Sequence, residues 1–339
     1  MASFRVRRWH LLSLLTVALA WPGVARADKN DLQLHNLCPD TGDCSLDSDA
    51  HSRYRSLMSE LGVVVAPRLM TPADTLGYAG FQFSAELGVT KISNNKQINN
   101  KAFWDGIEGV SANAVNASRP DSYLTTVGGF VRKGLWLPLP AFEFGVGAVS
   151  LLGSHMYAMQ GYAKIALQEG FHDWVLPSFA VRGSASQLLG TSQVNLTVYG
   201  VDVLASKAFS IGGTARIEPF VGWNVLFIDA RSGVIDSTPT CVAYAQRLLA
   251  PTDPTPVGCP AGGNGTWNDL ANNFTFPAQD IITRYRWFGG FKLKLSVVFF
   301  AAELDIVQHG TSHDTSEVGG ATDASGTQES FSLAAGFDF

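Results

Sequence analysis

The sequence predicts an all-β chain that closes into an antiparallel transmembrane β-barrel of ten strands, or of twelve, with a short N-terminal helix. The first observation behind this fold class is the strict alternation of the last residues. One face holds the apolar side chains, and small or polar residues take the other; the apolar residues are Phe331, Leu333, Ala335, Phe337 and Phe339. Because side chains along a strand have a period of two, such a tail suits a wall between lipid and a polar lumen.

The second observation is the N-terminal leader, which predicts secretion. Arg5, Arg7 and Arg8 precede an apolar run at 11–20, and the sequence Ala-Arg-Ala that ends at Ala27 fits a cleavage site. Residues 1–27 are therefore predicted to be a signal peptide. The apolar run is shorter than the roughly 20 residues of a membrane-spanning helix, and no later stretch approaches that length. A mature chain that enters a membrane would have to do so as a closed barrel.

Composition is the third observation. The chain holds 24 Lys and Arg against 29 Asp and Glu, and loss of the four Arg in the leader leaves a net charge of about −9. This charge argues against nucleic acid as a partner, because phosphate backbones demand a basic surface. Charged residues make up only 16% of the chain and Gly is abundant, at 34 residues. Low charge with many Gly and aromatic residues favours strands that face lipid over a soluble sandwich.

The predicted elements begin with an N-terminal segment, residues 28–74, that lies in the periplasm or in the lumen. It contains a predicted helix over 50–61, capped by Ser48 or Asp49 and ended by Gly62. Its apolar stripe follows helical spacing and consists of Tyr54, Leu57, Met58 and Leu61. Pro67 and Pro72 make the next stretch a poor interior strand, although its pairing would raise the strand count to twelve.

Residues 75–339 are predicted to form the barrel. Period-two alternation is found in ten segments, at 77–90, 122–134, 142–148, 157–168, 174–184, 193–207, 213–230, 278–294, 298–307 and 331–339. The connections between them alternate in length, and the long ones are 94–121, 232–278 and 309–327. Outer-membrane barrels have short periplasmic turns and long extracellular loops, so this rhythm places Phe339 at the periplasm.

Four cysteines remain after the leader, in two close pairs. An even number in an oxidising compartment indicates disulfides, and four Cys allow three connectivities. Local pairing of Cys38 with Cys44 and of Cys241 with Cys259 is the favoured one. The spacing fits no metal site, and no cofactor motif is present.

The inner faces of the predicted strands carry charged side chains. We expect these candidates to face the lumen: Glu86, Arg182, Asp202, Arg216, Glu218, Arg284, Arg286, Lys292, Lys294, Glu303 and Asp305. The neighbouring strands 278–294 and 298–307 would place a basic row beside an acidic row. The basic row is Arg284, Arg286, Lys292 and Lys294, and the acidic row is Glu303 and Asp305. Isolated buried charges are costly, so these groups must pair or line water. They would form either a pore constriction that sorts solutes by sign or an ion-paired filling that closes a narrow barrel.

One loop near the C-terminus carries candidate catalytic residues. His309, His313 and Asp314 lie close together in the sequence, as in some membrane hydrolases. The spacing fits no nucleophile motif, and the G-x-S-x-G pattern is absent. A solvated polar loop is the stronger interpretation of this cluster.

The aromatic tail resembles the assembly signal of Gram-negative outer-membrane β-barrel proteins, a likeness carried by Phe331, Leu333, Phe337 and Phe339. The resemblance implies an outer-membrane location after cleavage near Ala27, with membrane lipid, lipopolysaccharide and the barrel-assembly machinery as partners. It identifies no subfamily and brings over no functional residue. The leading hypothesis is a channel for an unknown small solute, in which the inner charges and helix 50–61 control passage. The alternatives are a structural or surface-interaction barrel with a filled lumen, which makes its contacts through the loop 232–278, and, more weakly, an outer-membrane hydrolase.

Overall fold

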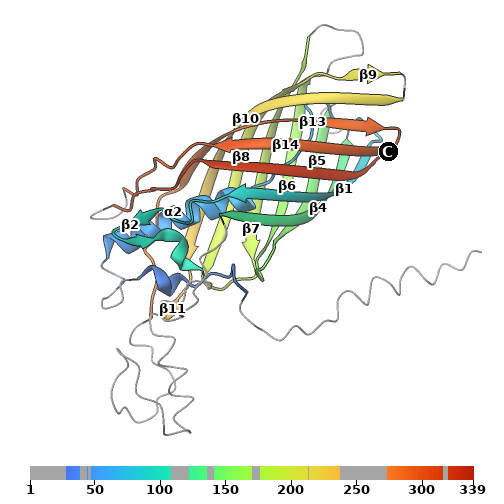
Figure 1. Cartoon of the computed structure of the whole chain (residues 1–339). Helices are drawn as coiled ribbons and strands as arrows, with labels where there is room; N and C mark the ends of the chain where they lie inside the picture. The colour runs from blue at the N-terminus through green and yellow to red at the C-terminus, as the bar shows by residue number, and fades with distance from the viewer. Residues whose placement is uncertain are drawn as a thin grey trace, which may run out of the picture.

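The computed structural model is a closed antiparallel β-barrel, drawn in Figure 1. It describes residues 28–38, 44, 47–107, 122–135, 141–169, 176–212, 214–236, 273–315 and 320–339. The predicted leader and the second cysteine pair, Cys241 and Cys259, lie outside these residues. No helix in the described ranges is long and apolar enough to span a membrane.

Ten long strands of the described chain form the wall, in agreement with the lower of the two predicted counts. Their bounds are β1 Phe81–Lys91, β4 Tyr123–Leu135, β5 Phe142–Leu151, β6 Tyr157–Gln168, β7 Ser178–Leu189, β8 Val194–Ser206, β10 Ala215–Ser232, β13 Ile282–Leu295, β14 Val298–Val307 and β15 Gln328–Asp338. Each strand pairs with its chain neighbour, and β1 also pairs with β15, with Ala85 opposite Ala335. This last pairing closes the wall and leaves no long edge strand.

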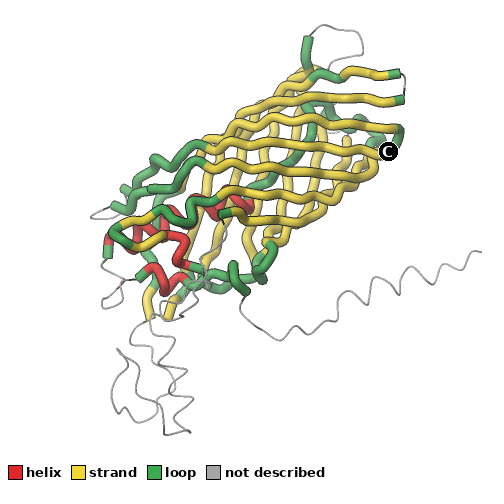
Figure 2. Tube along the Cα trace, viewed as in Figure 1, coloured by secondary structure: helices red, strands yellow, loops and turns green. Residues whose placement is uncertain are grey.

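Short elements lie at the ends of the barrel. They are the 3₁₀ turns η1 Leu34–Leu37 and η3 Phe103–Gly106, the ribbons β2 Gln97–Ile98 with β3 Lys101–Ala102 and β11 Ile235–Asp236 with β12 Asn273–Phe274, and the strand β9 Phe209–Ile211 beside β10. The two ends differ in the length of their connections. We call the end that holds Phe339 the short-turn end and the opposite end the long-loop end (Figure 2).

The outward faces of the strands form an apolar belt. Along β1 and β15 exposed and buried residues alternate, and the exposed positions are the predicted apolar ones, with Phe337 47% exposed and Phe339 65% exposed. The other wall strands add exposed residues such as Val146, Val203 and Leu304. A chain in water would not expose such a continuous apolar surface, whereas a bilayer requires it.

The one long helix of the described residues, α2 Ser48–Val65, lies inside the barrel and extends beyond the predicted range 50–61 at both ends. Asp47, and neither Ser48 nor Asp49, is its N-cap: the Asp47 carboxylate accepts from the Asp49 amide at 3.0 Å. The prediction that Gly62 ends the helix is wrong. A Cβ at Gly62 would lie 2.7 Å from Ile228 on β10, so the missing side chain lets the helix pass close to the wall.

The lumen has two halves of different chemistry. In the long-loop half, α2 packs on inward apolar residues, and its predicted stripe is fully buried; the core includes Tyr54, Leu57, Met58, Leu61, Leu196, Val198, Leu226 and Ile228. Tyr54 stacks on Phe276, with ring centroids 4.5 Å apart. In the other half the inward positions are largely polar or charged, and there the chain leaves α2 and becomes extended.

Candidate functional site

The centre of the candidate site is the extended stretch 66–76, which we call the lumenal strap. It follows α2 directly, belongs to no strand, and its residues 66–73 are all buried. Pro67 and Pro72 lack amide hydrogens and favour an extended backbone, so this stretch cannot join a ladder as an ordinary strand. Its carbonyl groups, buried without ladder partners, must therefore accept hydrogen bonds from somewhere else.

Cations of the barrel wall supply those hydrogen bonds. The carbonyl of Pro67 accepts from Arg286 at 3.0 Å, and that of Leu69 accepts from Arg132 at 3.0 Å. Lys164 donates to the carbonyls of both Pro72 and Asp74, at 3.0 and 2.9 Å. These inward side chains therefore hydrogen-bond to the backbone of the strap from Pro67 to Asp74.

Side-chain contacts continue the same pattern at both ends of the strap. Arg182 donates to the Thr71 hydroxyl at 2.9 Å, and the Ser206 hydroxyl accepts from the Ala73 amide at 3.0 Å. At the junction with α2, the Val65 carbonyl accepts from Gln160 and from Ser186, each at 2.8 Å. The strap is thus fastened to the wall from Val65 to Asp74.

Each of these wall cations also has an acidic partner on the wall. Arg132 lies 2.6 Å from Glu86, Lys164 lies 3.1 Å from Glu143, and Arg182 lies 2.9 Å from Asp202. Asp305 stands between Arg286 at 3.9 Å and the strap residue Arg68 at 3.7 Å, and Glu303 is buried nearby. Buried charges are tolerated when they are paired and hydrogen-bonded, and the strap carbonyls accept from one donor group each of Arg132, Arg286 and Lys164.

Arg68 is the basic residue of the strap itself. Its guanidinium donates to the Thr90 hydroxyl and to the carbonyl of Val64, the latter at 3.3 Å. A Cβ on Gly88 of β1 would lie 2.4 Å from Arg68 Nη1. The wall therefore leaves space for this side chain by having a glycine at the point of contact.

The short-turn mouth holds a cavity of about 150 Å³. Its lining is Pro72, Asp74, Thr75, Leu76, Arg216, Glu218, Lys292, Lys294 and Asp338. Arg216 lies 2.7 Å from Asp74 and 3.1 Å from Glu218. Lys292 and Lys294 both bind the Asp338 carboxylate, at 2.6 and 2.8 Å. The cations and the acids at this mouth balance one another.

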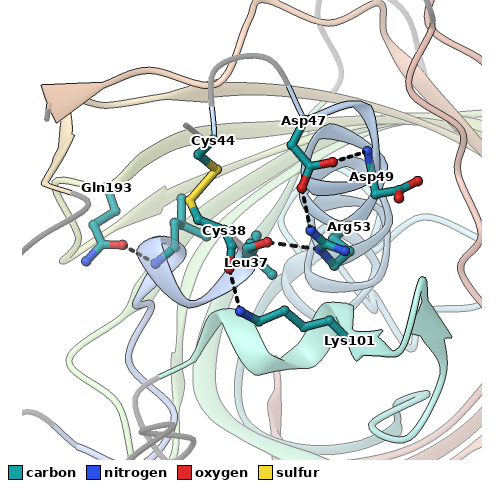
Figure 3. The surroundings of a disulfide bond; sticks show 9 residues. Leu37, Cys38, Cys44, Asp47, Asp49, Arg53, Lys101 and Gln193 are labelled. Carbon is teal, nitrogen blue, oxygen red and sulfur yellow. Dashed lines mark hydrogen bonds and ion pairs between the residues drawn. A yellow bond between two sulfur atoms is a disulfide. The ribbon is translucent and has the colours of Figure 1, made fainter. Parts of the chain in front are cut away.

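The long-loop mouth is organised around the start of α2, as shown in Figure 3. The predicted disulfide between Cys38 and Cys44 is confirmed, and its Cys38 carbonyl accepts from Lys101. Arg53 of α2 donates to the Leu37 carbonyl at 2.9 Å and pairs with Asp47 at 3.0 Å. The disulfide-closed loop is therefore tied to the helix.

Deeper in the long-loop half, α2 joins loops that are far apart in the sequence. The carboxylate of Glu60 accepts from the Trp104 indole at 2.7 Å and from the amides of Ser93 and Gly326 at 2.9 and 2.8 Å. Arg284 donates to Ser59 of the helix at 2.7 Å. The helix is thus the support on which two of the long connections rest.

The residues before the disulfide lie against the loops of the long-loop mouth. Asp31 accepts from the Ser154 hydroxyl and the His155 amide, each at 2.7 Å, and its other carboxylate oxygen lies 2.7 Å from the His155 ring. Partial burial acts to raise the pKa of Asp31, but the hydrogen bonds from His155, Ser154 and the Asp28 backbone outweigh it and lower that pKa below 3.8.

The structure places the predicted lumen-facing residues inside the wall. Arg216 and Lys294 are half-buried at the short-turn mouth, and the remaining ones are buried: Glu86, Arg182, Asp202, Glu218, Arg284, Arg286, Lys292, Glu303 and Asp305. As expected, the basic row on β13 lies beside the acidic row on β14, and Arg286 pairs with Asp305 at 3.9 Å, but most of the charges are not directly opposite one another. In the actual register Glu303 is opposite Gly290 and Asp305 is opposite Phe288. Lys292 and Lys294 consequently bind Asp338 of β15.

Three charged wall residues that hold the strap or pair with its holders are missing from the predicted set, namely Arg132, Glu143 and Lys164. All three lie on inward positions of predicted strands, so strand parity was the signal that could have found them. Arg68 could not have been found in this way, because no strand pattern covers the strap. Its significance depends on the lumenal position of the N-terminal segment.

The candidate hydrolase residues have structural contacts in the loop between β14 and β15. The His309 ring lies 3.2 Å from the Gly310 carbonyl, and Asp314 accepts from the Asp280 amide at 3.3 Å. His313 forms a backbone bridge with Thr322. Across the described ranges, no group of three or more His, Cys, Asp or Glu residues is arranged to hold a metal ion.

Comparisons with known proteins give no relative by sequence and only distant solved structures. No family model matches the chain, and no curated protein has a significantly similar sequence. Among solved structures, the attachment invasion locus protein Ail of Yersinia pestis is 8% identical, with 77% of this chain and 99% of that chain covered and a TM-score of 0.25. The N-terminal β-barrel domain of Pseudomonas aeruginosa OprF is 11% identical, covering 78% and 99%, with a TM-score of 0.24.

A third similar structure is the translocator domain of the autotransporter NalP from Neisseria meningitidis. It is 9% identical, with 78% of this chain and 89% of that chain covered and a TM-score of 0.32. At these identities the likeness concerns the barrel fold alone.

Proposed function

We propose that this chain, which has the fold of the Gram-negative outer-membrane β-barrel proteins, is a barrel sealed by its own N-terminal segment that acts through its long-loop end as a surface-interaction protein. The observation that carries the proposal is the fastening of the lumenal strap. Arg286, Arg132 and Lys164 donate to strap carbonyls, and residues 50–73 are buried from the helix through the strap. The inward charges, expected either to form a pore constriction or to fill the lumen as ion pairs, bind the backbone of this segment as well as one another.

The long-loop end is the part of the molecule best suited to meet a partner. Its loops are held on a rigid support by α2, through Glu60, Ser59 and Arg53, and by the disulfide. Rigid presentation lowers the entropy that a loop loses when it binds, and thus favours recognition. The expected contact loop, 232–278, leaves the barrel at this end, although residues 237–272 lie outside the described part.

The second candidate is a channel for small solutes that opens when the strap leaves. One observation favours it: the strap is held by side chains and not by a backbone ladder, so its removal would leave the ten-strand wall hydrogen-bonded. In that state the freed cations would face water and could sort solutes by charge. We do not propose an enzymatic activity, since the loop histidines have structural contacts.

Planar-bilayer recording distinguishes these two functions. We expect the full-length chain to show no steady single-channel current, and a variant that lacks residues 28–76 to show one. Heat-modifiable migration on gels would show that both chains contain a folded barrel. A stable, solute-permeable current from the intact full-length chain would overturn the sealed-barrel proposal and favour the channel.

A further inference from the structure

The N-terminal segment runs through the lumen in one direction, and its first described residues lie at the long-loop end. The Asn30 amide donates to the Gly153 carbonyl at 2.8 Å, in the loop between β5 and β6. The Leu34 amide donates to Gln193 at 2.7 Å, in the loop between β7 and β8. Both loops are at the end of the barrel opposite Phe339 (Figure 1).

The segment leaves the lumen at the other end. The Leu76 amide donates to Glu143 at 3.0 Å, and Asp74 pairs with Arg216 at the short-turn mouth. The chain then turns at 77–80, and Phe81 exchanges backbone hydrogen bonds with Phe339 as β1 begins. Residues 47–76 therefore cross the whole barrel from the long-loop end to the short-turn end, and β1 returns in the opposite direction.

This path has a consequence for the side of the membrane on which Asp28 lies. Long loops mark the external end of outer-membrane barrels and short turns the periplasmic end. A signal peptide delivers a chain to the periplasm, so residues that end outside must cross the membrane afterwards. The wall is apolar on its outer face, and a polar segment such as 28–49, rich in Asp, cannot pass through hydrocarbon. The lumen is the available polar route.

We propose that the barrel carries its own N-terminal segment across the outer membrane and holds residues 28–38 and the disulfide-bonded Cys44 at its mouth on the cell surface. The cargo is a polypeptide that passes the lumen during assembly and is then retained there. The strap and its wall cations act as the retaining device, because they bind the backbone of the crossing chain and so hold it after passage. This inference shares the barrel's orientation and the fastened strap with the proposed function, but it does not depend on whether the barrel conducts.

Cysteine labelling in whole cells tests the proposal. Lys29 is exposed on the first described stretch, Ser192 is exposed in the short connection between β7 and β8 at the long-loop end, and Ser210 of β9 is exposed at the short-turn end. Each is replaced singly by cysteine, as Lys29→Cys, Ser192→Cys and Ser210→Cys, and treated with a membrane-impermeant maleimide. The unmodified chain, treated in parallel, measures the background from the native cysteines.

We expect Lys29→Cys and Ser192→Cys to be labelled in intact cells, and Ser210→Cys to be labelled only after the outer membrane is permeabilised. Labelling of Ser192→Cys with protection of Lys29→Cys until permeabilisation would place the N-terminal segment in the periplasm and overturn the proposal. Labelling of Ser210→Cys alone in intact cells would show that the barrel has the opposite orientation in the membrane, and it would overturn the proposal as well. Neither result would change the bilayer conductance, so a failure here is distinguishable from a failure of the sealed-barrel proposal.

Discussion

Replacement of Arg132 by methionine should lower the free energy of unfolding far more than replacement of an ordinary surface cation does, because Arg132 holds the strap. Arg132 is 1% exposed, lies 2.6 Å from Glu86, and donates to the Ser84 hydroxyl at 2.6 Å and to the Leu69 carbonyl at 3.0 Å. Arg132→Met removes all three interactions and leaves the Glu86 carboxylate buried without its cation. Breaking a buried pair from one side costs about 3–5 kcal/mol, much of it the penalty of the orphaned charge.

The surface pair Lys91–Glu329 is the matched control. Its atoms are 3.2 Å apart, but the side chains are 46% and 64% exposed, so Lys91→Met should change stability by about 0.2–1 kcal/mol at most. The assay is reversible urea unfolding in lipid vesicles, followed by tryptophan fluorescence. The double variant Arg132→Met with Glu86→Leu removes both charges and should recover much of the loss. Equal effects of Arg132→Met and Lys91→Met would refute the idea that the wall cation is structural.

Three further predictions concern Gly88 of the wall beside the strap, the Cys38–Cys44 disulfide and the contacts of Asp31. Gly88→Val should displace the Arg68 guanidinium from its buried contacts and lower stability by about 1–3 kcal/mol in urea unfolding, because a Cβ there would lie 2.4 Å from Arg68 Nη1. Gly183→Val, with nothing within 4 Å, should be tolerated. Replacing the disulfide by Cys38→Ser with Cys44→Ser, six positions apart, should cost about 2 kcal/mol and should make residue 29 more accessible to protease; unchanged proteolysis would contradict this. Asp31 has a pKa below its ordinary 3.8, so its tether stabilises the mouth above pH 3.8 and is lost as the pH falls through the lowered value; Asp31→Asn should abolish that acid-dependent fall in melting temperature.

The wall of the barrel was predictable from the sequence because its rule is local. Strand parity needs only the residues of one strand, and it correctly identified ten segments and the inward position of residues such as Asp202 and Arg286. The three long connections lie at one end, as expected, but two connections at that same end, 152–156 and 190–193, are as short as the turns at the other. Bounds were less accurate: β1 begins at Phe81 and not near residue 77, since residues 77–80 form the turn from the strap.

The contents of the lumen were not predictable in the same way. The partners of Arg132 and Lys164 are backbone carbonyls, and a carbonyl has no sequence signature. The helix shows a weak amphipathic pattern because it is buried on every side, so even its polar residues Glu60 and Arg55 have internal partners. A glycine such as Gly62 often marks the end of a helix. Here it lies within the helix, because a side chain at this position would collide with Ile228 of the wall.

The central claim is that the inward charges hold a polypeptide in the lumen, and paired cysteines test it most directly. The Ala73 amide donates to the Ser206 hydroxyl at 3.0 Å, whereas Ser186 contacts the Val65 carbonyl near the other end of the strap. Ser206 is opposite Ser178, and Ser178 is eight residues from Ser186 along β7. Ser206 and Ser186 are therefore about 27 Å apart. Under mild oxidation, with the linked peptides identified by mass spectrometry, Ala73→Cys should cross-link with Ser206→Cys and not with Ser186→Cys. An Ala73→Cys that stays reduced in both double variants, in a folded barrel, would contradict the account.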